Sequence, residues 1–258
     1  MAWYLYLLAV VAGFLAGIIN TVAGSGSLIT LPVLIFLGLP ATVANGTNRI
    51  GVILQNTVAG LSFGHSKVLD LKGALILSLP AILGSILGAQ TAVNLDEVMM
   101  ERAIGAVMVI MLFVIWLRPQ RWLDGKLQTL SGPVTIAQVI SMFAIGVYGG
   151  FIQAGVGVFL LAALVVSVGY DLVRANAVKI VIILIFTLFS LFVFARNDQV
   201  NWGIGVLLGC GNMLGAWLAA RLTVKRGSTW VRQLLMATVA LSAAYLLGLF
   251  DWLARLLG

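Results

Sequence analysis

Between Gly13 and Pro32 the sequence reads GFLAGIINTVAGSGSLITLP. Apolar residues lie on both sides of a short polar centre, Asn20 to Ser27, that is rich in glycine. Glycines permit positive φ and close backbone approach, and they weaken a continuous helix. A helix broken here leaves free N–H groups at the start of the next half-helix, and such an N-terminus binds anions. A second interpretation is that the glycines only let helices pack closely.

The composition around this stretch places the whole chain in a membrane. Of its 258 residues, 62% are hydrophobic and 9% are charged, against roughly 25% charged residues in soluble domains. The mean hydropathy is +1.13, and no soluble core buries so much apolar surface. A soluble enzyme, a nucleic-acid-binding protein and a disordered protein are therefore excluded. The formal net charge of +7 comes from basic residues that lie mostly between apolar runs, as in cytoplasmic loops.

Ten apolar segments are expected, in two sets of five. They lie at about 3–20, 24–38, 42–63, 72–93 and 98–117, and again at 134–152, 155–169, 172–195, 202–220 and 230–249. The chain thus divides into a first transmembrane repeat (1–117), a cytoplasmic linker (118–133) and a second transmembrane repeat (134–258). A full crossing takes about 20 helical residues. The segments at 24–38 and 155–169 are shorter and begin at glycines, so they are candidates for broken or re-entrant helices.

The two halves share a pattern of small and amide residues in the same order. At an offset of 131 residues, Gly24-Ser25-Gly26 falls on Gly155-Val156-Gly157. With small drifts of the offset, Asn20 falls on Gln153, and further glycines correspond: Gly13 and Gly17 with Gly146 and Gly150, and Gly84 and Gly88 with Gly211 and Gly215. An odd number of crossings per repeat makes the second half enter the membrane from the opposite side. The repeats are therefore expected to be inverted.

The distribution of charge gives the expected orientation. Loops at 64–72, 118–133, 169–174 and 221–232 hold ten of the 15 Lys and Arg residues, whereas the loop at 94–101 is acidic. Under the positive-inside rule the basic loops are cytoplasmic, and both termini face outward. Inverted repeats of this kind are the architecture of many secondary transporters, whose site lies at the repeat interface near the middle of the membrane.

Two basic residues fall inside apolar segments, at related positions of the repeats. Arg49 ends the run Asn45-Gly46-Thr47-Asn48-Arg49, and Lys179 lies where the repeat places Asn48. Charge at membrane depth is costly, so such residues indicate a functional site. Two cations near the repeat interface suit an anionic substrate, and no acidic residue lies well inside an apolar segment. The alternative is that both side chains extend to the membrane interface, because each lies near the start of its segment.

Enzyme chemistry has little support in the sequence. The only histidine, His65, lies in a loop at a segment end, and no metal-binding motif or catalytic pair of carboxylates occurs. An intramembrane protease would need a Ser25–His65 or a Ser25–Lys179 dyad. The single cysteine, Cys210, excludes an internal disulfide and suits helix packing. We therefore expect no catalytic residue, no metal and no cofactor.

Two stretches of the first half resemble the TauE/SafE sulfite exporter family. One is the opening stretch at 13–32, where glycines are followed by an apolar run and a proline. The other joins a Gly-Leu-Pro turn at 38–40 to a Thr-Asn-basic triplet at 47–49, with arginine where the family commonly has lysine. Residues 149–157 look like the family's second copy, although Val178-Lys179 stands where the first copy has Thr47-Asn48. The resemblance implies a prokaryotic inner-membrane exporter of sulfite, sulfoacetate or other organosulfonates.

These observations predict an all-α polytopic membrane protein of the prokaryotic cell membrane, with two inverted five-segment repeats. We expect a secondary transporter of a small sulfur-containing anion that works by alternating access; a channel or a carrier for another small anion or solute is the alternative. Its expected partners are this anion and the lipid bilayer, with a homo-oligomer left open and no nucleic acid. The expected substrate-binding residues come from both halves: Asn20, Gly24, Ser25, Gly26, Ser27, Thr47, Asn48, Arg49, Gln153, Gly155, Gly157, Asn176 and Lys179.

Overall fold

The computed structural model describes residues 3–116, 130 and 132–246, and its elements in these ranges are all helices. In chain order they are α1 (Trp3–Ala23), α2 (Ser27–Phe36), α3 (Ala41–His65), α4 (Leu71–Val93), α5 (Glu97–Trp116), α6 (Ile136–Phe151), α7 (Val156–Ala162), the π-helix η2 (Ala163–Val168), α8 (Leu172–Arg196) and α9 (Trp202–Leu246). The prediction of an all-α protein is confirmed.

Polar side chains set where several helices begin. Asp70 accepts a hydrogen bond from the Gly73 amide (3.0 Å) at the start of α4, and Asp171 accepts from the first amides of α8. Thr135 and Gln138 form a reciprocal capping box at the start of α6. Each cap satisfies amides that have no partner within the helix. The caps therefore fix the points at which the chain enters these apolar segments.

Four helices in the described ranges are long and apolar enough to cross a bilayer: Tyr6–Ala23 of α1, α4, α8, and Trp202–Lys225 of α9. By contrast, α2 has 10 residues, which span about 15 Å, whereas the hydrocarbon core is about 30 Å thick. Helix α7 and η2 together cover only Val156–Val168. Neither of the segments that begin at glycines is thus long enough to cross the membrane as one helix.

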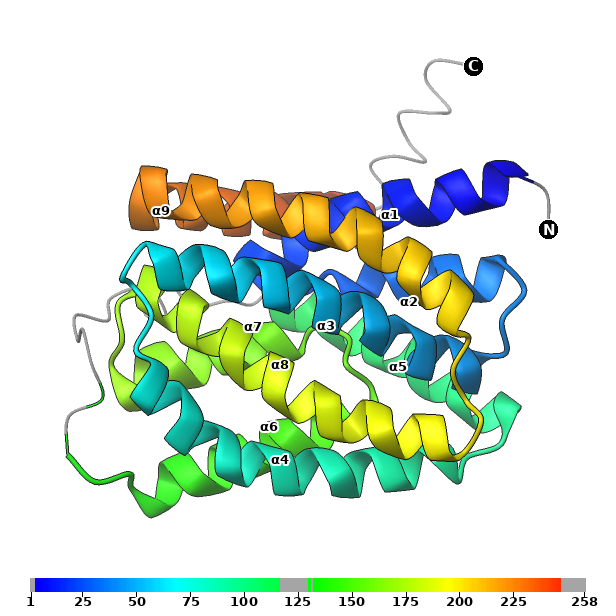
Figure 1. Ribbon diagram of the computed structural model, residues 1–258, viewed down its shortest axis with the longest axis horizontal. Coiled ribbons are helices and arrows are strands. Elements are labelled where there is room, and N and C mark those ends of the chain that lie inside the picture. The colour runs from blue at the N-terminus through cyan, green and yellow to red at the C-terminus, as the bar shows by residue number, and fades with distance from the viewer. Residues whose placement is uncertain (1–2, 117–129, 131, 247–258) are drawn as a thin grey trace.

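One expected loop is wrong. The sequence predicts a loop at 221–232, but α9 is helical from Trp202 to Leu246. Residues 221–232 contain no proline and a single glycine, Gly227, so little in them interrupts helical hydrogen bonding. Figure 1 shows the α9 ribbon as two runs, an orange run in front and a redder run behind it. The expected linker at 118–133 lies mostly outside the described residues, as does the end of the expected segment at 230–249.

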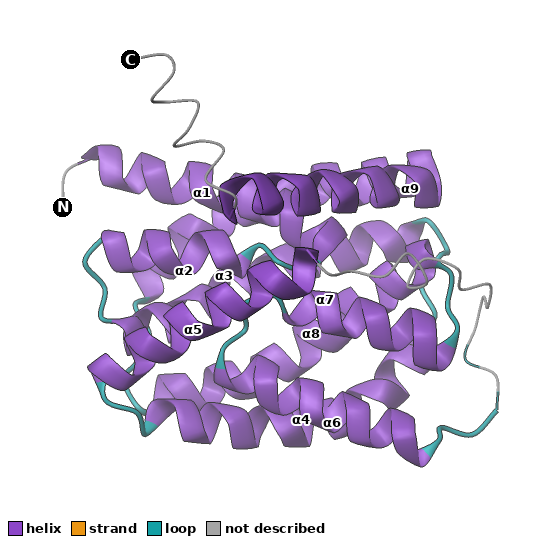
Figure 2. Cartoon of the chain, turned by 180° about the vertical axis from the view of Figure 1, so that it is seen from behind, coloured by secondary structure: helices purple, strands orange, loops and turns teal. Residues whose placement is uncertain are grey.

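Helices α1 and α9 form one outer layer of the molecule, and α4 and α6 form the other (Figure 1, Figure 2). A Cβ atom added to Gly13 would lie 2.3 Å from the carbonyl oxygen of Leu208, and one on Gly17 would lie 2.4 Å from that of Asn212. Only glycine permits so close a contact between two backbones. Residue numbers rise together along the contact, so α1 and α9 run parallel where they meet.

Helices α4 and α6 pack in the same manner. A Cβ atom on Gly84 would lie 2.2 Å from the carbonyl oxygen of Phe143, and one on Gly88 would lie 1.9 Å from that of Val147. This pair is therefore parallel as well. In the sequence repeat, the contact glycines of α4 correspond to glycines of α9, and those of α1 correspond to glycines of α6. Each outer layer thus joins one helix from each half of the chain.

Helices α3 and α8, which carry Arg49 and Lys179, lie between the outer layers (Figure 1). Arg49 contacts Ser190, whereas a Cβ atom on Gly60 would lie 3.8 Å from Ile180. Residue numbers rise on α3 as they fall on α8, so these two helices run antiparallel. The short helices α2 and α7 lie in the same middle region (Figure 2). The broken segments and the two intramembrane cations therefore come together there.

Candidate functional site

The first helix break follows α1, which ends at Ala23. Gly24 has a φ of +76°, a left-handed conformation that favours glycine, and its amide donates to the carbonyl of Asn20 (2.9 Å). The Gly26 amide donates to Asn20 Oδ1 (3.4 Å), and both Ser25 and Ser27 are buried. The helix therefore breaks within the stretch that the sequence predicts.

The second break follows α6, and it touches the first. Ile152 is extended, Gly155 has a φ of +73°, and α7 begins at the next residue. The amide of Gly157 donates to the carbonyl of Gly24 (3.1 Å). A Cβ atom on either Gly24 or Gly157 would lie 2.4 Å from the backbone of the other. Glycine at both positions is what lets the two breaks meet, and in this structure they are closed on each other.

Arg49, on α3, is fully buried and binds the end of α6. Its Nη1 donates to the carbonyl of Gly149 (3.2 Å) and to the hydroxyl of Ser190 (2.7 Å), and its Nη2 donates to the carbonyl of Gly150 (2.6 Å). The guanidinium carbon lies 4.4 Å from the centre of the Phe194 ring, a cation–π contact. Carbonyls in the last turn of a helix lack helical donors, so the guanidinium supplies donors that the broken helix cannot.

Lys179, on α8, is also fully buried and binds the end of α1. Its Nζ donates to the carbonyls of Asn20 (3.2 Å) and Thr21 (3.1 Å). These carbonyls lie in the last turn before the first break, where the negative end of the helix dipole favours a cation. Arg49 and Lys179 are both 0% exposed, so neither side chain extends to the surface of the protein.

Arg49 and Lys179 thus make the same kind of contact, one from the first half of the chain to the second and the other from the second half to the first. Each cation comes from one half of the sequence and binds the carbonyl end of the broken helix in the other half. The four helices concerned, α1, α3, α6 and α8, contain no Asp or Glu. Within these helices the positive charges are therefore met by carbonyl dipoles and not by carboxylates.

Two asparagines of α3 tie the broken segments to it. Asn48 Nδ2 donates to Ser27 Oγ (3.0 Å), and the Thr30 hydroxyl donates to Asn48 Oδ1 (2.6 Å). Asn45 Nδ2 donates to the carbonyl of Phe151 (2.8 Å), the last residue of α6. The structure therefore brings Asn48 and Ser27 together at the first break, and it adds Asn45 at the second.

The other predicted residues lie in different surroundings. The Thr47 hydroxyl accepts from the Asn201 amide (2.8 Å), so it faces the connection between α8 and α9 and contacts neither break in this way. Gln153 Nε2 donates to Thr187 on α8 (2.5 Å). Gln153 Oε1 and both amide atoms of Asn176 are buried with no hydrogen-bond partner among the described residues. Such atoms cost about 1–3 kcal/mol each when unsatisfied, so these two side chains retain capacity to bind a polar group.

Sequence reasoning missed Thr21, Asn45, Thr187 and Ser190. Thr21 acts through its main-chain carbonyl, which leaves no mark in the sequence. Thr187 and Ser190 lie on α8 about two and three turns beyond Lys179 and on the same side of the helix. The sequence could therefore have indicated Thr187 and Ser190, because both lie on the same helix face as Lys179.

Ser25 and His65 are not brought together. Ser25 is buried at the first break, whereas His65 is exposed at the end of α3, with its Nδ1 2.7 Å from the carbonyl oxygen of Leu61. In the part of the chain that the structure describes, no three His, Cys, Asp or Glu side chains gather as a metal site.

Comparison with known proteins gives matches over nearly the whole chain. The family described as sulfite exporter TauE/SafE matches residues 9–246. A "probable membrane transporter protein" of Haemophilus influenzae is 28% identical over 224 residues, 87% of each chain. The similar protein ORF9 of a Sinorhizobium species is 26% identical over 92% of this chain and 90% of its own length. YfcA of Escherichia coli, also named a probable membrane transporter, is 25% identical over 90% and 86%. No solved structure matches.

Proposed function

Because this chain belongs to the TauE/SafE sulfite exporter family, we propose that it is a secondary carrier for a small sulfur-containing anion. Its relatives are bacterial membrane transporters by name, and the chain is a multi-pass membrane protein. The proposed substrates are sulfite, sulfoacetate and other organosulfonates, and export is the proposed direction. The substrate is the part of the proposal that experiment must decide.

The pair of buried cations is the observation that carries this proposal. A Lys or Arg at membrane depth is costly and marks a substrate or ion pathway by default. Arg49 and Lys179 hold the carbonyl ends of α6 and α1 beside the two breaks. A sulfite or sulfonate group presents three oxygens that accept the same kinds of N–H donors. An entering anion would therefore replace carbonyl oxygens as the acceptors of these cations.

The proposed site lies between the two breaks. The start of α2, with Ser25 and Ser27, would supply amides and hydroxyls at the positive end of a helix dipole. Gln153 and Asn176 support the site because they are buried with unused hydrogen-bonding atoms. The full proposed set is the one that the sequence predicts, with Thr47 at its edge because it faces the connection between α8 and α9. It comprises Asn20, Gly24, Ser25, Gly26, Ser27, Thr47, Asn48, Arg49, Gln153, Gly155, Gly157, Asn176 and Lys179.

Alternating access follows if the two halves, 1–117 and 134–258, are inverted repeats of five segments each. The parallel packing of α1 on α9 and of α4 on α6 supports that relation, because each pair joins helices that the repeat exchanges. The antiparallel crossing of α3 and α8 supports it as well. The contact between Gly24 and Gly157 closes the path in this state. In the other states of the cycle the two breaks would separate and expose the cations.

Sulfite uptake into proteoliposomes tests the role of the cations. Lys179→Met and Arg49→Met remove the charge while keeping an elongated side chain, and each is expected to reduce uptake to the level of protein-free vesicles. Lys179→Arg keeps the charge and is expected to retain part of the uptake. Arg196→Met, which changes an exposed arginine at the end of α8, is the matched control and should transport normally.

Melting temperatures of the same variants separate transport from folding. Arg49→Met and Lys179→Met remove donors from helix-end carbonyls, at a cost of about 1–3 kcal/mol per group left unsatisfied, so these two variants are expected to lose some stability. Variants that stay folded and still take up sulfite at the wild-type rate would contradict the role of the cations. Absence of sulfite and sulfoacetate uptake by the folded wild type would contradict the proposed substrate class.

A further inference from the structure

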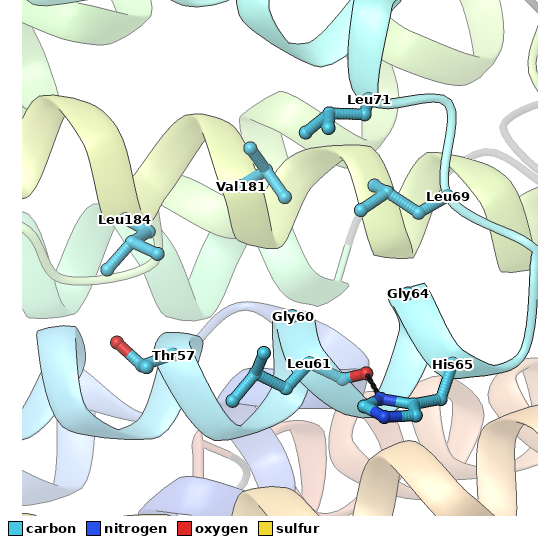
Figure 3. Close-up of a pocket in the computed structure, with 9 residues that line it drawn as sticks. All are labelled: Thr57, Gly60, Leu61, Gly64, His65, Leu69, Leu71, Val181 and Leu184. Carbon is cyan, nitrogen blue, oxygen red and sulfur yellow. Dashed lines mark hydrogen bonds between the residues drawn. The ribbon is translucent and has the colours of Figure 1, made fainter.

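A groove of about 550 Å³ lies between α3 and α8, near the connection from α3 to α4 (Figure 3). In Figure 3, α3 forms one wall, with Leu61, and α8 forms the other, with Val181 and Leu184. Leu69 and Leu71 lie toward one end. The volume falls in the range of about 300–1,000 Å³ that is common for ligand pockets. The lining is mostly apolar, with Thr57 and His65 as its polar residues, and the space is large enough for an organic ligand.

Two glycines of α3 shape this groove. A Cβ atom on Gly64 would meet no atom within 4 Å, and one on Gly60 would come no closer than 3.8 Å to any neighbour. By contrast, Cβ atoms on Gly84 and Gly88 of α4 would lie 2.2 and 1.9 Å from the backbone of α6. Gly60 and Gly64 therefore do not serve to bring two helices into contact. They leave a hollow along the outer face of α3.

The rim of the groove is exposed and apolar. The side chains of Leu61 and Leu71 are 60% and 53% exposed. The opposite wall belongs to α8, which is one of the helices long and apolar enough to cross a bilayer. Leu71 begins α4, another of these helices. Exposed leucines on a membrane-spanning helix face hydrocarbon, so a lipid acyl chain is the apolar ligand expected in this groove.

The connection from α3 to α4 adds positive charge at one end of the groove. Lys67 and Lys72 are both exposed. Lys67 lies two residues from His65 and from Leu69, and Lys72 directly follows Leu71; all three of these neighbours line the groove. Asp70 is the one acidic residue of this connection, and it accepts hydrogen bonds from the Tyr170 hydroxyl (2.6 Å) and from the Leu130 amide (2.7 Å). These hydrogen bonds do not cancel the charge of the carboxylate, but two lysines against one aspartate leave residues 66–72 with a net positive charge.

We propose that this groove binds a phospholipid with an anionic headgroup. One acyl chain lies along Gly60 and Gly64, and Lys67 and Lys72 bind the phosphate. Basic pockets between transmembrane helices bind anionic lipids through this combination of charge and apolar surface. The proposal does not depend on which solute the protein carries.

Native mass spectrometry of the purified full-length chain tests the acyl-chain part. Phosphatidylglycerol and phosphatidylcholine with identical acyl chains are the probes, and the wild type is expected to retain phosphatidylglycerol preferentially. The Cβ atom of Gly64→Leu would meet nothing within 4 Å, and its isobutyl group is expected to occupy the groove, so the variant should fold and lose about tenfold in affinity for phosphatidylglycerol. Gly105→Leu is the matched control, because Gly105 of α5 is exposed and its Cβ atom would also meet nothing within 4 Å.

Charge variants test the headgroup part. Replacement of both lysines, Lys67→Gln with Lys72→Gln, is expected to remove the preference for phosphatidylglycerol while phosphatidylcholine binding persists. If Gly64→Leu binds phosphatidylglycerol as tightly as Gly105→Leu does, the acyl chain does not lie in this groove. If the wild type retains both lipids equally, the two lysines do not select an anionic headgroup.

Discussion

Arg49 and Lys179 show how single charges are accommodated at membrane depth in this protein. Each side chain is 0% exposed, and each donates to two main-chain carbonyls at the end of a broken helix. These carbonyls lie in the last turns of the two helices, where the helix dipole adds negative potential. In the proposed carrier, an anion would compete with these carbonyl oxygens for the N–H donors of Arg49 and Lys179.

Asp70 and Tyr170 make a further polar contact between the halves, in the connections outside the membrane-spanning helices. The Tyr170 hydroxyl donates to Asp70 Oδ2 (2.6 Å). Burial alone would raise the pKa of Asp70, but hydrogen bonds from Tyr170 and from the Gly73 and Leu130 amides, together with the charge of Arg174, hold the pKa below its ordinary value. Burial, and then the bond to Asp70, raises the pKa of Tyr170. The carboxylate is therefore the favoured form in the folded protein.

Tyr170→Phe removes this hydroxyl donor. Because Asp70 is partly exposed, the variant is expected to lose about 1 kcal/mol of unfolding free energy at pH 7. Thermal unfolding in detergent measures the loss, and Tyr6→Phe, which changes an exposed tyrosine of α1, is the control. Because the pKa of Asp70 is lower in the folded protein than in the unfolded chain, where it is about 3.9, the carboxylate stabilises the folded protein at pH values above about 3.9. This stabilisation is lost as the pH falls through the pKa of the folded protein. The difference between wild type and Tyr170→Phe should therefore shrink at low pH, and a constant difference would contradict the contact.

At the scale of elements, helix boundaries could be predicted where the chain carries a breaker or a cap. Gly24 and Gly155 both have positive φ and both interrupt a helix. The end of α8 and the start of α9 also lie close to their predicted positions. The loop at 221–232 could not be excluded from the sequence, because basic residues mark loops and helix ends alike. The π-helix at Ala163–Val168 has no residue signature either, since its hydrogen bonds run between main-chain groups.

Gly24→Ala tests the contact between the two breaks, and Gly38→Ala is its matched control. Both glycines have positive φ, +76° and +88°, so alanine costs about 1–2 kcal/mol of backbone strain at either position. Only at Gly24 would the added Cβ atom also lie 2.4 Å from another backbone, whereas at Gly38 it meets nothing within 4 Å. Gly24→Ala is expected to lower the melting temperature further and to abolish sulfite uptake.

Thermal unfolding and vesicle uptake, measured on both variants, separate strain from contact. Gly38→Ala should show the strain cost alone and retain uptake. Equal loss of stability in the two variants, with uptake retained by both, would show that the contact between the breaks is not needed for transport.

In the molecule as a whole, the matched glycines predict a correspondence between helices of the two halves, but they do not predict which helices touch. Gly13 and Gly17 match glycines of α6 in sequence, yet they contact α9. Packing between the halves depends on three-dimensional complementarity, which a list of small residues does not encode. The apolar runs that predict the membrane location also make Arg49 and Lys179 stand out as site residues, because a charged residue within such a run is rare. Their carbonyl partners could not, because every residue carries a carbonyl.

We propose a carrier for a small sulfur anion, in which the two halves expose one site to each side of the membrane in turn. Counterflow in proteoliposomes distinguishes such a carrier from a channel. Vesicles preloaded with unlabelled sulfite should take up external labelled sulfite faster than empty vesicles, and uptake should saturate with concentration. Uptake that rises linearly with sulfite concentration and is not stimulated by preloaded sulfite would show a channel. Absence of exchange by the folded wild type would contradict sulfite transport.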